Sequence, residues 1–403
     1  MPRDSVNVAA DAGLGARIEA ARTRRGMSRA AVAGLCGKTE DWLKKIEGGL
    51  RGTSLTMVVR LAEVLKVPSL TDLLGAHAPT GVYARPEHTA LDAVRRALIT
   101  YGATDASPPD LTTLQQRIRQ AWRLRSVSGQ DRSDLAAVLP RLIVDAQAAV
   151  RVAGSAAQKR HAYRLQADVG HLGQLYLCYQ DAPELLWVVA DRALNAAYES
   201  QDAASVARAA WFSAYLYRDF GLVSNAHQVV DDALRLVEPE TSPVALRQRS
   251  VLHLASACNH AREGRPAQAW RAWDAAVATD QAGASAPSPH ALFGATIPDV
   301  ALTLDVELGK TASALRRAQA TDTEAIASVP RRTRLTIEVA RAYLLKREHA
   351  SAVHMLQRAQ RTSPEATLYS MHARGMVVEL LAHAGPMLRP EVTNLAELLD
   401  VVE

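Results

Sequence analysis

Apolar residues recur three and four positions apart along most of the chain, which is the period of a helix with one buried face. In the first 75 residues, glycines and N-capping Ser or Thr residues divide this pattern into short segments. The pattern predicts five short helices with the apolar positions Leu14, Ile18 and Ala21; Val32, Ala33 and Leu35; Trp42, Leu43 and Ile46; Leu55, Val58, Val59, Ala62 and Leu65; and Leu70, Leu73 and Leu74. No run of alternating apolar and polar residues indicates a strand, so the whole chain is predicted to be all-α.

The length of 403 residues predicts more than one domain, and polar stretches rich in Gly and Pro suggest the boundaries. The expected parts are a flexible tail over 1–13, a compact helical domain over 14–75, a linker over 76–88, a helical connecting region over 89–160 and a helical repeat region over 161–403.

The region after residue 160 repeats a pattern of a small, a large and a small residue at spacings of four and three. Its copies are Ala226, Val230 and Ala233; Ala269, Trp273 and Ala276; and Ala352, Leu356 and Ala359, with weaker copies at Ala314 and at Leu186, Ala190 and Ala193. Neighbouring copies lie about 40 residues apart, the length of one helix–turn–helix unit. The pattern resembles the tetratricopeptide repeat, whose units stack into an α-solenoid. The spacing exceeds the usual length of about 34 residues, so generic α-solenoid pairs remain the alternative.

Charge distinguishes the first domain from the rest of the chain. The net charge is +5, but residues 1–75 hold 12 Lys and Arg against 8 Asp and Glu, while the remainder holds 35 against 34. A small basic module beside a nearly neutral body indicates a polyanionic partner.

Several kinds of chemistry find no support in the sequence. The three cysteines, Cys36, Cys178 and Cys258, are far apart, and the histidine pairs lack thiols or carboxylates at zinc-ligand spacing. We therefore expect no metal site and no cofactor. Without a catalytic motif, a signal-peptide core or an apolar run of membrane length, the expectation is a cytoplasmic protein that is not an enzyme and has no membrane partner.

Residues 14–74 carry a set of matching positions that spans the predicted domain. These are Arg22, Gly26-Met27-Ser28, Val32-Ala33, Gly37, Ile46-Glu47-x-Gly49, Ser54-Leu55 and Leu61-Ala62-x-x-Leu65-x-Val67. They closely resemble the DNA-binding domain of phage repressors and Cro, the XRE-type helix-turn-helix family. In such a domain the third helix presents its amino-terminal end to the major groove.

The resemblance also implies roles for single residues. Residues at the positions of Glu40, Asp41 and Lys45 reach base edges, and Arg29 contacts a phosphate. Further backbone contacts are expected from Lys38, Thr39, Lys44 and Arg51. The acidic pair departs from the usual family pattern. It either reads bases or complements the helix dipole and disfavours nonspecific binding.

Other residues of this domain are expected to be structural. Ala33 allows two helices to cross closely, and Gly37 allows the turn between them. Trp42 either packs at the junction of the second and third helices or donates to a phosphate. Arg22 and Glu47 occupy positions where the family often forms a partly buried ion pair.

The first helix of each repeat unit carries polar and aromatic residues that suit a peptide or a small amphipathic ligand. The candidates are Tyr176, Trp211, Tyr215, Arg218, His253, Asn259 and Arg334. For any single aromatic, a place in the solenoid core is the alternative. A repressor-like domain followed by repeats resembles peptide-sensing regulators of Gram-positive bacteria and a group of actinobacterial regulators, in which a segment similar to LFGATIPDVALTLDVELGK recurs.

These expectations combine into one hypothesis. The protein is expected to be a homodimeric transcription regulator that binds double-stranded DNA at an inverted repeat and responds to a peptide or small-molecule effector. The alternative is a protein-interaction scaffold of tetratricopeptide type, in which the helix-turn-helix domain serves only as a tether.

Overall fold

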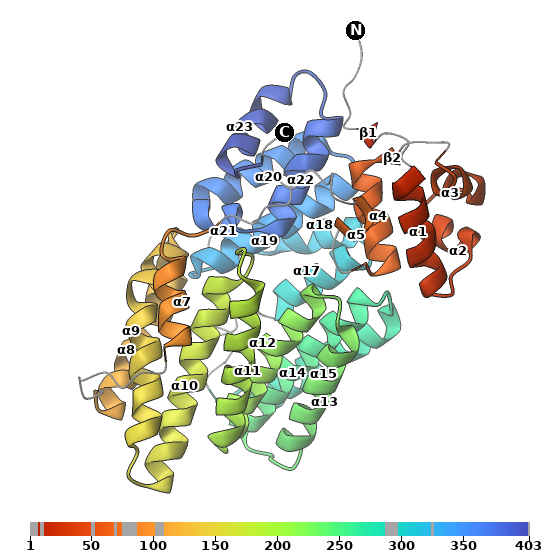
Figure 1. Cartoon of the computed structure of the whole chain (residues 1–403). Coiled ribbons are helices and arrows are strands. Elements are labelled where there is room, and N and C mark those ends of the chain that lie inside the picture. The colour runs from red at the N-terminus through yellow and green to blue at the C-terminus, as the bar shows by residue number, and fades with distance from the viewer. Residues whose placement is uncertain are drawn as a thin grey trace. The chain divides into compact units, whose positions relative to one another are not determined.

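The computed structural model describes residues 7–8, 12–49, 53–67, 71–74, 87–100, 109–286, 297–323 and 326–401. The predicted all-α class is confirmed, because the described residues are almost entirely helical. The chain divides into two compact units, and Figure 1 labels the helices of each. The first comprises residues 1–84, 378–387 and 402–403 and contains the amino-terminal helices. The second comprises residues 85–377 and 388–401 and contains the helical hairpins. No helix in the described ranges combines the length and hydropathy that a membrane crossing requires.

The first unit contains the five predicted helices. Their bounds are α1 (Ala12–Arg24), α2 (Arg29–Leu35), α3 (Glu40–Glu47), α4 (Leu55–Leu65) and α5 (Thr71–Leu74). The pattern did not predict two short strands, β1 (Asn7–Val8) and β2 (Thr53–Ser54), which pair antiparallel. The tail that was expected to be flexible therefore contains one strand of this pair. The sequence shows no sign of it, because two residues are too few to show an alternating pattern.

The core of the first unit follows the predicted apolar positions with one exception. Ile18, Val32 and Leu43 have no exposed surface, whereas Leu35 is 55% exposed. Leu35 is the last residue of α2, and the following residue, Cys36, is buried instead. The prediction that Leu35 points inward is therefore wrong. Helix α2 ends at Leu35, and Cys36 occupies the next buried position after Val32 and Ala33. Leu55, Val59, Leu70 and Leu74 lie outside the residues whose side chains are described.

The second unit is a succession of helical hairpins. Its helices are α7 (Leu91–Ile99), α8 (Leu111–Val127), α9 (Asp131–Val152), α10 (Ala156–Leu177), α11 (Pro183–Glu199), α12 (Ala203–Asp219), α13 (Val223–Val237), α14 (Pro243–Arg262), α15 (Pro266–Ala282), α17 (Ile297–Glu307), α18 (Thr311–Ala320), α19 (Val329–Leu345), α20 (His349–Thr362), α21 (Pro364–Leu368), α22 (Met371–His383) and α23 (Arg389–Leu398). Helix α22 belongs to this unit only as far as Val377. The helices α10 to α20 pack as consecutive pairs, and the first helix of each pair also contacts the first helix of the next.

The sequence repeat corresponds to one position in these hairpins. Ala226, Ala269, Ala314 and Ala352 lie near the start of a second helix, each with at most 1% exposed surface. Five residues earlier, each hairpin turn has a left-handed residue: Gly221, Gly264, Gly309 and Arg347, with φ of 74°, 70°, 72° and 61°. The turn and the small residue therefore recur together, because each fixes how closely the two helices of a hairpin approach.

The region expected to connect the two domains belongs to the second unit. Helices α8 and α9 pair with each other, and α9 contacts α21. The backbone N–H groups of Arg132 and Ser133 donate to Glu365 Oε2 at 2.9 and 3.1 Å, and Ser363 Oγ donates to the Gly129 carbonyl at 2.7 Å. The helices that were expected to connect the domains therefore contact the last helices of this unit, and the expected boundary near residue 160 stays a prediction.

Candidate functional site

Helix α3 of the first unit begins at a side-chain cap. Thr39 Oγ1 accepts a hydrogen bond from the Trp42 N–H at 3.3 Å, and Glu40 and Asp41 follow in the first turn. Lys44 and Lys45 lie in the last turn. Acids at the amino end and cations at the carboxyl end both complement the helix dipole. This distribution of charges therefore stabilises α3 without any contact to DNA.

The two faces of α3 differ in burial. Trp42, Leu43, Ile46 and Glu47 are buried. Glu40, Asp41, Lys44 and Lys45 are exposed, as are Lys38 and Thr39 just before the helix. Trp42 lies in the hydrophobic core of the unit, which matches the packing alternative rather than a phosphate contact. Arg51 lies outside the described residues, so its expected DNA contact stays a prediction.

An ion pair connects the first and last turns of this exposed face. Lys45 Nζ lies 2.7 Å from Asp41 Oδ2, and the two side chains are 50% and 67% exposed. An exposed pair of this kind contributes only about 0.2–1 kcal/mol, so Lys45 can exchange its carboxylate partner for DNA at little cost. Asp41 thus has a structural partner in addition to any contact with a base.

Beneath α3 lies a cluster of four charged side chains. Arg22 Nε and Nη2 donate to the two oxygens of Glu47 at 2.6 and 3.1 Å, which is the ion pair expected from the sequence. Arg29 Nε also donates to Glu47 at 2.5 Å, and Arg29 Nη2 donates to Glu19 at 2.7 Å. The hydrogen bond and charge of Glu47, helped by Glu19, raise the pKa of Arg29.

The sequence did not reveal the roles of Arg29 and Glu19 in this cluster. Arg29 was expected at a phosphate, yet two of its nitrogens are engaged within the unit. The spacing between α1, α2 and α3 that brings these side chains together becomes visible only in three dimensions.

Small residues set the position of α3. Ala33 is fully buried, and Gly37 has a φ of +64° in the turn between α2 and α3, as expected for both positions. Gly15, which the sequence did not single out, lies where α1 meets the end of α3. A Cβ atom there would be 2.4 Å from the Glu47 carbonyl oxygen and 2.5 Å from that of Ile46. Only glycine allows the two backbones to come this close.

The second unit contains a cavity of about 260 Å³. It is lined mainly by the first helices of the hairpins, together with α8, α9 and the α21–α22 region. Four of the predicted ligand-binding residues line it: Trp211, Tyr215, Arg218 and Arg334.

The other three predicted ligand-binding residues are not part of the cavity lining. Tyr176 is fully buried, and its hydroxyl lies 3.1 Å from His88 Nδ1. Asn259 is also buried and accepts a hydrogen bond from Arg218 Nη1 at 2.7 Å, so it positions a lining residue. His253 lies on α14 without contributing to the lining.

The cavity lining carries more arginines than carboxylates. The arginines are Arg125, Arg132, Arg218, Arg262, Arg331 and Arg334, and the carboxylates are Asp131, Asp219, Glu307 and Glu338. Burial alone would raise the pKa of Glu307, but Arg262, Arg341 and His372 lower it to about 2. The Arg262 and Arg341 guanidinium groups lie 3.1 and 3.0 Å from its two oxygens.

A small group of phenols lies at the same cavity. Tyr179 and Tyr215 are joined through their hydroxyl groups, and Tyr179 Oη donates to Asp219 Oδ2 at 3.1 Å. Burial raises the pKa of Asp219 and of both tyrosines. Asp219 is exposed and lines the cavity, and the neighbouring arginines Arg262 and Arg218 act to lower its pKa against the effect of burial. The sequence indicated Tyr179 and Tyr215 as ligand-facing aromatic residues but gave no role to Asp219.

Comparison with known proteins identifies the first unit. Residues 13–74 match a family model described as a helix-turn-helix domain, which agrees with the resemblance of residues 14–74. No curated protein and no solved structure matches the chain. The match covers α1 to α5, so it indicates that the first unit binds DNA. It does not extend to the second unit, whose function has to be inferred from its geometry.

Proposed function

We propose that this protein is a sequence-specific regulator of transcription that binds double-stranded DNA through α3. The observation that carries the proposal is the exposed, charged face of α3 in a unit that matches a helix-turn-helix domain. In domains of this kind that helix lies in the major groove.

The charges on α3 suit separate tasks at the DNA. Lys45 reaches guanine O6 and N7 after leaving Asp41, and Glu40 accepts from the cytosine amino group. Lys38, Thr39 and Lys44 contact phosphates, which supplies attraction but no sequence information. A carboxylate near phosphates is repelled, so Asp41 weakens binding to incorrect sites more than to the operator.

The regulator acts as a homodimer on an inverted repeat. A single small domain makes few base contacts, whereas two domains grip half-sites separated by about 34 Å, one helical turn of DNA. The tetratricopeptide-like hairpins of the second unit supply the dimer contact in this proposal.

The effector binds in the cavity of the second unit. Six arginines against four carboxylates favour an anionic ligand, and Trp211 and the phenols favour one with an apolar part. A volume of about 260 Å³ suits a small molecule or a few residues of a peptide. Binding shifts the curvature of the hairpin array and changes the separation of the two reading helices.

Recovery of genomic DNA fragments bound by the purified full-length protein tests this function. The wild type is expected to enrich fragments that share one inverted repeat. Lys44→Ala combined with Lys45→Ala should abolish the enrichment while leaving the helix content unchanged.

A charge-matched control removes two cations from the other unit, with Lys159→Ala combined with Arg160→Ala on α10, where both residues are exposed. This variant should enrich the same fragments as the wild type. If wild type and the α3 variant recover the same unrelated sequences, the regulator proposal fails and the scaffold alternative gains support.

A further inference from the structure

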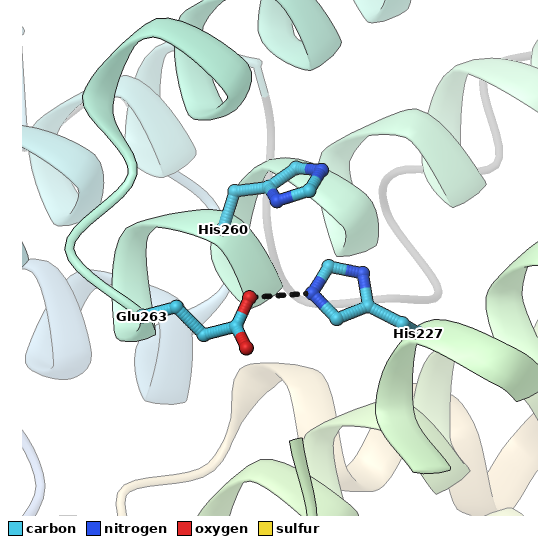
Figure 2. Close-up of side chains that lie close together, drawn as sticks. All are labelled: His227, His260 and Glu263. Atoms are coloured by element: carbon cyan, nitrogen blue, oxygen red, sulfur yellow. Dashed lines mark hydrogen bonds and ion pairs between the residues drawn. The ribbon is translucent and has the colours of Figure 1, made fainter. Parts of the chain in front are cut away.

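Two imidazoles and a carboxylate from separate helices come together in the second unit (Figure 2). His227 lies on α13, His260 lies in the last turn of α14, and Glu263 is the residue that ends α14. His227 Nε2 is 3.0 Å from Glu263 Oε2, and the centroids of the two imidazole rings are 4.6 Å apart. One possible ligand atom from each of the three residues lies within 4.8 Å of the others.

The spacing of these atoms is close to that of a metal site. Zinc binds imidazole nitrogen and carboxylate oxygen at about 2.0–2.2 Å, so donors around one tetrahedral ion lie about 3.4 Å apart. Small side-chain rotations would bring the three donors from their present separations to that distance. Two imidazoles with one carboxylate suit zinc and neighbouring divalent transition ions better than calcium or magnesium.

The state of His260 provides a second, independent observation. Its Nδ1 atom is buried and has no hydrogen-bond partner within the described part of the chain. A buried polar nitrogen without a partner costs stability that a bound ion would restore.

The surrounding charges permit a cation at this place. Arg265 Nη1 lies 3.2 Å from Glu263 Oε2, but the arginine side chain is 52% exposed and can turn toward water. Loss of such a surface pair costs about 0–1 kcal/mol. Asp231 on α13 adds a second negative charge that acts on His260.

We propose that His227, His260 and Glu263 bind a divalent transition-metal ion of the zinc class. The sequence predicted no metal site, because His260 and Glu263 alone offer two ligands and His227 is separated from Glu263 by 36 positions. The ion links the α12–α13 hairpin to α14 of the next hairpin. Three protein ligands leave a fourth position for water or another small ligand.

The location gives this site a structural consequence. Arg262 lies between two of the three ligands in the chain, lines the cavity and pairs with Glu307 at 3.1 Å. The proposed ion would therefore lie within one turn of α14 from this cavity-lining arginine.

Metal titration of the untagged full-length protein, stripped with a chelator and dialysed, tests the proposal. We expect Zn²⁺ to bind with one equivalent per chain in calorimetry and Co²⁺ to give visible bands of tetrahedral intensity. His227→Ala and His260→Ala should each weaken Zn²⁺ binding by about 10- to 100-fold or more, given that even indirect partners of metal ligands have effects of this size.

Two further variants separate loss of a ligand from loss of the fold. Glu263→Gln keeps a group that can hydrogen-bond His227 but removes the charge, so it should weaken metal binding while the metal-free melting temperature stays close to that of the wild type. His253→Ala, which removes a histidine from the same helix α14 outside the cluster, should bind Zn²⁺ as the wild type does. Absence of stoichiometric binding to the wild type, or unchanged binding to both His227→Ala and His260→Ala, would overturn the proposal.

Discussion

Glu47 is a buried carboxylate held by two guanidinium groups, and it connects the first three helices of the amino-terminal unit. Its side chain is 1% exposed, while those of Arg22 and Arg29 are 12% and 35% exposed. A buried charge is tolerated only when it is well paired, so the cost of a substitution depends on which member of the cluster is removed.

Substitution of the shared acid should cost more than substitution of either arginine. Glu47→Ala leaves Arg22 without its buried partner and should lower the free energy of unfolding of the first unit by about 3–5 kcal/mol. Arg22→Ala leaves Glu47 paired with Arg29 and should cost about 1–3 kcal/mol. Chemical denaturation followed by circular dichroism measures both values. Equal costs, or a larger cost for Arg22→Ala, would contradict the shared role of Glu47.

Gly15 allows a comparison between two glycines on helices of the same unit. Gly15→Ala places a Cβ 2.4 Å from the Glu47 carbonyl oxygen, so the end of α3 must move, at a cost of about 1–3 kcal/mol. Gly34→Ala on α2 has nothing within 4 Å and should stabilise the unit by about 0.5–1 kcal/mol through helix propensity. Chemical denaturation measures the free energy of unfolding of both variants. If both substitutions changed it in the same direction, the close approach of α1 to the end of α3 would be refuted.

At the scale of elements, the sequence predicted helices and turns well where local chemistry decides them. Thr39 and Ser28 cap their helices as expected, and the repeated small residues lie buried at equivalent positions. The equivalent turn at Arg347 was harder to recognise, because a left-handed arginine lacks the signal that glycine gives at Gly264. Contacts between distant elements, such as those of Glu365 with Arg132 and Ser133, left no local signal at all.

Glu307 connects three successive hairpins and should give stability a defined pH dependence. It lies on α17 and pairs with Arg262 of α14 and Arg341 of α19. Its folded-state pKa of about 2 is below the ordinary 4.5, so its contribution is complete above that ordinary value and is lost as the pH falls toward 2. A shift of this size corresponds to about 3 kcal/mol.

The expected result is a pH-dependent difference between wild type and Glu307→Gln. The variant should be about 3 kcal/mol less stable at about pH 7, and the difference should shrink steadily below about pH 4. Glu348→Gln provides a control, because that residue is 42% exposed in a surface pair and should change stability by less than about 1 kcal/mol. A Glu307→Gln deficit that does not depend on pH would argue against the ion-pair assignment.

At the scale of the whole molecule, the sequence predicted a helix-turn-helix unit followed by a helical repeat region. The helix-turn-helix unit could be predicted because the spacing of its residues across five helices is specific to that family. Residues 13–74 match the family model. Only part of the cavity lining could be predicted from the sequence. Its arginines from α8 and α9, Arg125 and Arg132, lie in the region that was expected only to connect the domains. The proposed metal site gave no recognisable signal in the sequence, because His227 reaches His260 and Glu263 only after two hairpins pack together.

The most direct test of the central claim is the salt dependence of DNA binding by the full-length protein. On a fragment recovered from the genome, the logarithm of the association constant should fall linearly with the logarithm of the salt concentration, with a slope of about −0.9 for each phosphate contact. Lys44→Ala combined with Lys45→Ala should reduce the magnitude of that slope by about 1 for each bound domain, because Lys44 is the one of the two that contacts a phosphate. Binding that ignores salt, or a slope that the double substitution leaves unchanged, would contradict the assignment of α3 as the DNA-binding surface.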